Sequence, residues 1–118
     1  MKQEDKELLL KDLCSRLQYG VKMNHIADNE VSPITLIGIN EDYIILRGGG
    51  YSYVPVEHYK PYLFPLSSIT EEQIAQLEFW AFMKEYHKIT NFYYENHIDF
   101  RGLIEKGLAI DCTNLNIY

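Results

Sequence analysis

The chain has 118 residues, 47% of them hydrophobic and 24% charged, a composition that favours one globular domain spanning residues 1–118. Its formal net charge of −6, without a cluster of Lys and Arg, makes nucleic acid an unlikely partner because nucleic-acid-binding proteins usually carry a basic face. No apolar run is long enough for a signal peptide or a membrane span, so the chain is predicted to be cytoplasmic, with no membrane partner.

Residues 6–19 predict a short amphipathic helix that Gly20 ends. Its apolar positions recur every three or four residues and are Leu9, Leu10, Leu13, Cys14 and Leu17. The opposite, solvent-facing side is expected to hold Lys6, Lys11, Asp12 and Arg16. On this pattern Cys14 is interpreted as a buried structural thiol and not as a nucleophile, because free cysteine packs as a small hydrophobic residue.

Three short runs rich in β-branched and aromatic residues follow, at 34–39, 43–47 and 51–56. Their three-residue connectors are typical of an antiparallel meander, to which residues 21–26 can add a strand. The connector Gly48-Gly49-Gly50 precedes a strand and not a helix, so it predicts a hairpin turn instead of a phosphate-binding loop. Pro55, Pro61 and Pro65 argue against a further central strand, so residues 57–68 are expected to form one helical turn and an extended connector.

Thr70 and Gln73 form a capping box that predicts the start of a helix continuing to about Tyr86. Thr90 can cap a further helix, and Asp99 can cap a short helix at 101–106 that Gly107 ends. Residues 108–112 then predict a strand, and residues 113–118 a frayed tail. The sequence therefore predicts an α+β fold in which a small antiparallel sheet of three to five strands packs against the long helix of the C-terminal half.

No metal site, cofactor or catalytic residue is predicted. The four histidines lack the paired spacing of metal ligands, and His97-x-Asp99 is the nearest approach to such a pattern. Asp99 has a competing role as a helix cap, and Glu71-Glu72 is explained by the preference for negative charge in the first turn of a helix.

Aromatic residues are the main indication of a binding surface. The candidate binding residues are Tyr43, Arg47, Tyr51, Tyr53, Tyr59, Tyr62 and Trp80. Tyr51 and Tyr53 must project from one side of a strand, where they could bind a peptide. The alternative is that these tyrosines pack across the sheet and beneath the long helix.

Segments 10–22, 60–70 and 97–109 together resemble a group of small proteins encoded in the genomes, prophages and phages of gut anaerobes. The group has no known activity, so the resemblance implies a context, an accessory protein of a mobile element, and no site residues. Gln18 stands where the group usually has a proline, and Phe64 stands where it usually has a basic residue.

Three functional hypotheses follow. The first is a non-enzymatic module that binds a protein partner, or itself, through the aromatic sheet surface and the apolar residues of helix 70–86. The second is a phage-type nucleic-acid-binding regulator that uses Tyr51, Tyr53, Arg47 and Lys60. The third is a small enzyme that uses His97 and Asp99, with Arg101.

Overall fold

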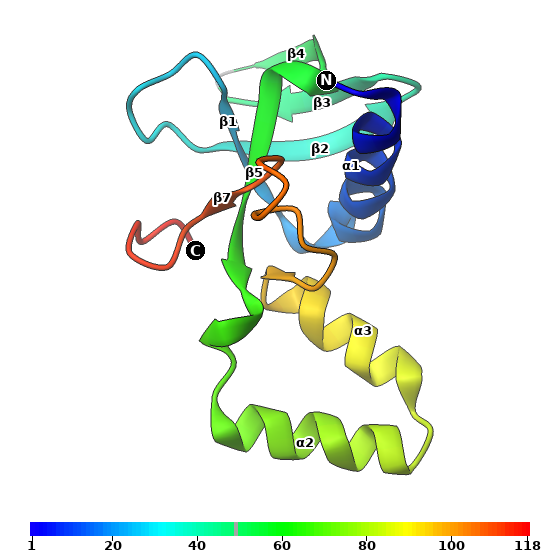
Figure 1. The fold of residues 1–118 in the computed structure, drawn as a ribbon. Coiled ribbons are helices and arrows are strands. Elements are labelled where there is room, and N and C mark those ends of the chain that lie inside the picture. The colour runs from blue at the N-terminus through cyan, green and yellow to red at the C-terminus, as the bar shows by residue number, and fades with distance from the viewer. Residues whose placement is uncertain (49) are drawn as a thin grey trace.

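The computed structural model describes residues 1–48 and 50–118 and has an α+β fold (Figure 1). The α-helices are α1 (Gln3–Arg16), α2 (Glu71–Phe82) and α3 (Tyr86–Glu95). The strands are β1 (Lys22–His25), β2 (Ile34–Asn40), β3 (Tyr43–Arg47), β4 (Tyr51–Pro55), β5 (Tyr59–Pro65), β6 (Ile98–Asp99) and β7 (Ile110–Asp111). Single 3-10 turns, η1 (Leu17–Tyr19), η2 (Val56–His58) and η3 (Leu66–Ser68), follow α1, β4 and β5. Gly49 of the expected glycine turn lies outside the described residues.

The sheet is larger than predicted and mixed. Within the described residues its order is β4-β3-β2-β1-β5-β6, and β7 also pairs with β5. Strands β1 to β5 pair antiparallel, which confirms the predicted meander and its additional strand at residues 21–26. The short strands β6 and β7 both run parallel to β5.

The prediction that the prolines exclude a central strand is wrong, because β5 pairs on both of its sides. This strand changes partners along its length: residues 59–61 pair with β1, and residues 62–65 pair with β6 and β7. Pro61 stands at the end of the first ladder and Pro65 at the end of the second. The prolines, which lack an N–H group, do not have to donate in these ladders. Other residues of β5 donate instead, such as Phe64, whose N–H donates to the carbonyl of His97 at 2.8 Å.

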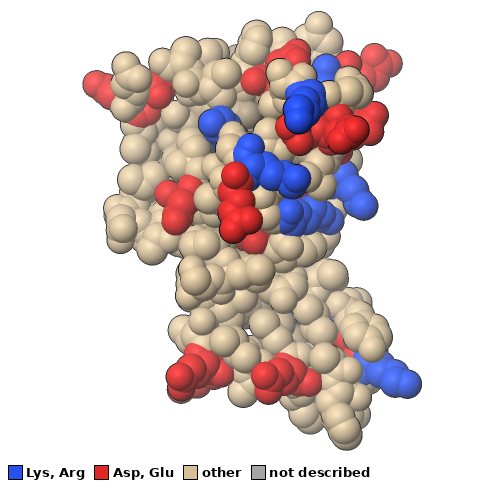
Figure 2. Space-filling model, in the orientation of Figure 1, with Lys and Arg blue, Asp and Glu red and all other residues tan. Residues whose placement is uncertain are grey.

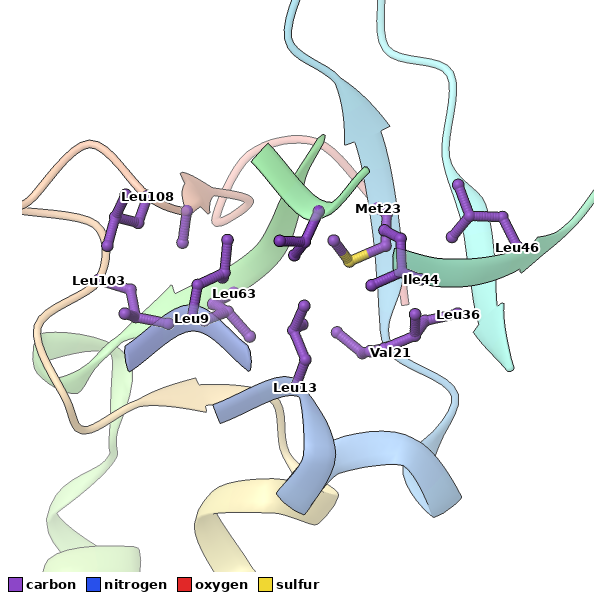
Figure 3. Packing of buried hydrophobic residues seen from close by; sticks show 12 residues of the cluster. Leu9, Leu13, Val21, Met23, Leu36, Ile44, Leu46, Leu63, Leu103 and Leu108 are labelled. Carbon is purple, nitrogen blue, oxygen red and sulfur yellow. The ribbon is translucent and has the colours of Figure 1, made fainter. Parts of the chain in front are cut away.

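Helix α1 forms where predicted, and it is this helix that packs into the core with the sheet. Most of the largest fully buried apolar side chains come from α1, β1 to β3 and β5, among them Leu9, Leu13, Met23, Leu46 and Leu63 (Figure 3). Gly20 adopts the left-handed conformation, with φ of 69°, and ends η1 as expected. Cys14, however, is exposed, so its interpretation as a buried thiol is wrong.

Helix α2 starts at the predicted capping box, but it ends at Phe82 and packs against α3, away from the sheet. The single helix predicted up to residue 86 is interrupted by a turn in which Lys84 has a left-handed φ of 58°. Helix α3 then begins at Tyr86, so Thr90 lies inside the helix and does not cap it. The Thr90 hydroxyl donates instead to the carbonyl of His87, one turn back, at 3.1 Å.

The C-terminal segment is bound to the sheet. Asp99 accepts hydrogen bonds from the backbone N–H groups of Leu103 and Ile104, as a cap does, although residues 101–107 form turns and not the predicted helix. The tail is not frayed, because the Tyr118 hydroxyl donates to the carbonyl of Tyr62 and accepts from the N–H of Lys22, each at 2.8 Å. This phenol therefore bridges β1 and β5.

Candidate functional site

Four of the predicted binding residues gather on one face of the β3–β4 hairpin. Tyr51 lies opposite Arg47, and Tyr43 lies opposite Pro55. Cross-strand partners project to the same side of a sheet, and Tyr53 shares the side of Tyr51, two residues away. Tyr51 and Tyr53 are 71% and 67% exposed, whereas Ile44 and Leu46 of the opposite face are buried. These residues face solvent, which excludes for them the alternative of core packing.

The other three candidate residues lie elsewhere. Tyr62 is only 1% exposed and belongs to the core, and Tyr59 is half-buried against the core, with its ring edge-on to His25. Trp80 lies on α2, where it lines a shallow groove of about 190 Å³ with Phe92 and Lys88 of α3. The aromatic cluster read from the sequence is therefore divided among the sheet face, the core and the α2–α3 pair.

Strand β4 is an edge strand with open backbone groups. The N–H of Val56 donates to the carbonyl of Asp42 at 3.1 Å, and that of Gly48 to the carbonyl of Gly50 at 3.0 Å. Hydrogen-bonded pairs alternate along an antiparallel ladder, so the even-numbered residues of β4 point their backbone groups toward β3. The N–H and C=O groups of Tyr51 and Tyr53 consequently point outward, away from the sheet.

The helices α2 and α3 form a hairpin, defined here as residues 71–95, that projects from the rest of the molecule (Figure 1). Neither helix contains a buried residue. Its large exposed apolar side chains are Ile74, Phe79, Phe82, Met83 and Tyr86. The whole chain exposes 7293 Å², roughly 600 Å² more than the surface typical of a protein of this mass.

The apolar residues of α2 point in two directions. Leu77 and Trp80 are half-buried, and their spacing places them on the side that packs against α3. Ala75, Phe79 and Phe82, spaced by four and three residues, lie on the other side and form what we call the outer stripe. Phe79 is 55% exposed and Phe82 is 82% exposed, so the outer stripe has no cover within the described chain.

A buried charged cluster joins α1 to the base of the hairpin. The prediction that Asp12 and Arg16 face solvent is wrong, because both belong to this cluster. Asp12 and Arg16 are fully buried, with 2.7 Å between Arg16 Nε and Asp12 Oδ2. Arg101 donates from Nη1 to Asp12 Oδ1 at 2.7 Å, and Arg16 donates from Nη2 to the carbonyl of Ile98 at 2.7 Å. The only signal in the sequence was the four-residue spacing of Asp12 and Arg16, which also occurs on exposed helix faces.

Aromatic rings enclose this cluster. The Arg101 guanidinium carbon lies 4.4 Å from the centre of the Phe100 ring, and Arg101 Nη2 donates to the Tyr94 hydroxyl at 3.2 Å. Burial raises the pKa of Tyr94, but hydrogen bonds with Ser15 and Arg101 and the charges of both arginines outweigh burial and leave the pKa below its usual value. The cluster thus fixes the last turn of α3 to α1 and to the segment after β6.

His97 and Asp99, the residues of the enzyme hypothesis, are not hydrogen-bonded to each other in the described part of the chain. Both carboxylate oxygens of Asp99 accept backbone N–H groups. His97 is buried and stacks face to face on Tyr118, with 3.6 Å between ring centres. Burial, assisted by the charge of Arg16, lowers the pKa of His97 to about 4, so its imidazole is neutral near pH 7.

A depression of about 520 Å³ lies between η3 and the segment after β6. Its lining includes Ser67, Asp99 and Arg101, but the last two are already bound by Leu103, Ile104, Asp12 and Tyr94. Burial raises the pKa of the second cysteine, Cys112, to about 11, which keeps it a protonated thiol. Among the described residues, no group of three or more His, Cys, Asp and Glu side chains is arranged to hold a metal ion.

Comparison with known proteins assigns no family to this chain. No protein-family model, no curated protein and no solved structure matches the chain. Within the described residues, no helix has both the length and the apolar character needed to cross a bilayer.

Proposed function

We propose that this protein is a non-enzymatic, cytoplasmic protein-interaction module whose docking surface is the α2–α3 hairpin. The observation that carries the proposal is the uncovered outer stripe, in which Phe79 and Phe82 project into solvent from a helix without a buried residue. Exposed apolar side chains gathered on one projecting element are typical of protein-binding surfaces, and phenylalanine and methionine are enriched in their centres.

The free energy of apolar burial favours a functional state in which a partner covers this surface. Burial of apolar surface contributes about 25 cal/mol per Å², so two well-exposed phenylalanines represent several kcal/mol of binding free energy when a partner covers them. A helix that leaves them in water gains nothing from them for its own fold. Binding of a partner therefore explains why the hairpin exposes these two phenylalanines.

The hairpin is also held firmly enough to present a defined surface. The Thr70 hydroxyl accepts from the N–H of Gln73 at 3.2 Å, while the Gln73 side chain accepts from the N–H of Thr70 at 2.9 Å. At the other end, Tyr94 of α3 is bound to Arg101, which is in turn bound to Asp12. A pre-ordered surface loses less conformational entropy on binding than a flexible one.

A second candidate surface is the tyrosine face of the β3–β4 hairpin. Tyr51 and Tyr53 are exposed, and their backbone groups are open at the edge of the sheet, which suits the addition of an extended peptide as a further strand. The nucleic-acid hypothesis remains a prediction and is weaker, because Arg47 is the only cation among the four predicted binding residues gathered on this face. The resemblance to proteins of mobile elements likewise stays a prediction.

Site-specific photo-crosslinking tests this proposal. A photoreactive phenylalanine analogue is placed at Phe82, at Tyr51, or at the exposed Lys11 of α1 as a matched control, in cells that express the full chain. We expect a discrete protein adduct from position 82 and none from position 11. An adduct from position 51 alone would move the docking surface to the sheet, and no adduct from either position would contradict a protein-interaction role.

A further inference from the structure

We infer that the partner of the outer stripe is a second copy of this chain, with the two α2 helices packed antiparallel about a twofold axis near Phe79. This inference rests on the proposed function, because it names the partner of that same surface. Two properties of α2 support it: the order of large and small side chains, and the charges at its two ends.

The outer stripes of two copies are complementary only when the two α2 helices run antiparallel. Its small residue, Ala75, stands four residues before Phe79, and its large residue, Phe82, stands three residues after Phe79. An antiparallel pair centred near Phe79 places Phe82 of each copy over Ala75 of the other. Large side chains packed against small ones fill such an interface, whereas a parallel pair would set Phe82 against Phe82.

The charges at the two ends of α2 favour the same orientation. The first turn of α2 carries Glu71 and Glu72, and Lys84 and Lys88 follow α2 in sequence. Figure 2 shows acidic side chains at the start and in the middle of α2 and basic side chains at the opposite end of the hairpin. Glu78, in the middle of α2, would lie near its own copy in either orientation and does not distinguish them. Lys88 forms an ion pair with Glu85 at 3.1 Å, while Lys84 forms none with the described residues. The antiparallel pair brings Lys84 of each copy to the acidic first turn of the other. A parallel pair would bring two acidic turns together, and like charges at an interface disfavour association.

The apolar area of the outer stripe limits the strength of this dimer. Phe79 and Phe82 expose about 270 Å² per copy, taking about 200 Å² as the full area of each side chain, whereas Ile74, Met83 and Tyr86 lie outside the stripe. Two copies would bury about 550 Å² of aromatic surface, which is below the range for stable interfaces, so we expect a weak dimer that forms only at high concentration.

The test begins with sedimentation equilibrium of the full chain over a wide range of concentrations. We expect a monomer–dimer equilibrium, and we expect Phe82→Ser to raise its dissociation constant at least tenfold. The matched control is Ile26→Ser, an exposed apolar side chain outside both candidate surfaces, which should leave the constant unchanged. Circular dichroism verifies that each variant keeps its helices, and the exposure of Phe82 makes this the expected result.

A charge-exchange experiment then tests the orientation. Lys84→Glu alone and the pair Glu71→Lys and Glu72→Lys alone should each weaken self-association, because each homodimer then opposes like charges twice. A mixture of the two variants should restore association, because both contacts of the mixed dimer again join opposite charges. Absence of this rescue would overturn the antiparallel geometry.

The remaining outcomes separate this inference from the proposed function. A chain that stays monomeric throughout, or a dimer that Phe82→Ser does not dissociate, would overturn the second copy as the partner of the outer stripe. In the crosslinking experiment, an adduct at position 82 with twice the mass of the chain supports the inference. An adduct of any other mass would overturn it and leave the hairpin as a protein-docking surface.

Discussion

Asp12 is fully buried and forms ion pairs with Arg16 and Arg101, so its substitution should strongly lower the stability of the fold. We expect Asp12→Ala to lower the free energy of unfolding by about 3–5 kcal/mol, because Arg16 would remain buried without its counter-charge. Urea denaturation measures the change. The control is Lys11→Ala at the neighbouring exposed position, which should alter stability by less than about 0.5 kcal/mol. Equal effects of the two substitutions would show that the cluster is not a buried ion pair.

His97 gives the stability of the fold a defined dependence on pH. Its pKa falls from about 6.5 in an unfolded chain to about 4 in the fold, so below pH 6.5 the unfolded state binds a proton that the native state does not. Stability should therefore fall as the pH drops from about 6.5 to 4, by at most about 3 kcal/mol from this group. Urea denaturation at pH 7, 5.5 and 4.5 measures the decline.

Substitution of His97 isolates its share of this pH dependence. Asn is the matched replacement because it tolerates the left-handed backbone of this position, where φ is 56°, and does not titrate. His97→Asn should flatten the pH dependence between 6.5 and 4 relative to the unsubstituted chain. Identical slopes for the two proteins would mean that His97 binds its proton as readily in the fold as in the unfolded chain.

Among the secondary-structure elements, α2 depends on its capping box more than on tertiary burial. We expect Thr70→Ala to weaken the helix by about 1 kcal/mol, because the N–H of Gln73 loses its acceptor. Because α2 contains no buried residue, the change should appear as faster amide hydrogen exchange within residues 71–82. Thr70→Ser, which keeps a hydroxyl, should exchange almost as slowly as the unsubstituted chain. Unchanged exchange in the alanine variant would contradict a role for the cap.

Elements governed by local chemistry could be predicted, and those governed by tertiary contacts could not. The capping box at Thr70 and the meander through β2, β3 and β4 follow from neighbouring residues, and both appear where expected. Strand β5 escaped prediction because its pairing depends on β6 and β7, which are distant in sequence and only two residues long. Asp12 escaped prediction because its arginine partner, Arg101, comes from 89 residues away.

The same distinction applies to the candidate site. The common face of Tyr51 and Tyr53 follows from the two-residue period of a strand, and their exposure confirms that this face lies in solvent. The sequence shows the outer stripe as an excess of apolar residues in helix 70–86. It does not show that no other part of the described chain covers these residues. A helix that is apolar on two sides is typical of a protein core, and only the structure shows that α2 packs against α3, away from the sheet.

At the scale of the whole molecule, the projecting hairpin should unfold at a lower free energy than the sheet and α1. Leu63 is fully buried on β5, so Leu63→Ala should cost about 2–5 kcal/mol of global stability and lower the urea midpoint. Leu77 is half-buried between α2 and α3, and Leu77→Ala should leave that midpoint nearly unchanged while amide exchange accelerates across residues 71–95. Hydrogen exchange by mass spectrometry resolves the two regions. A global midpoint that falls equally in both variants would show instead that the hairpin and the sheet unfold as one unit.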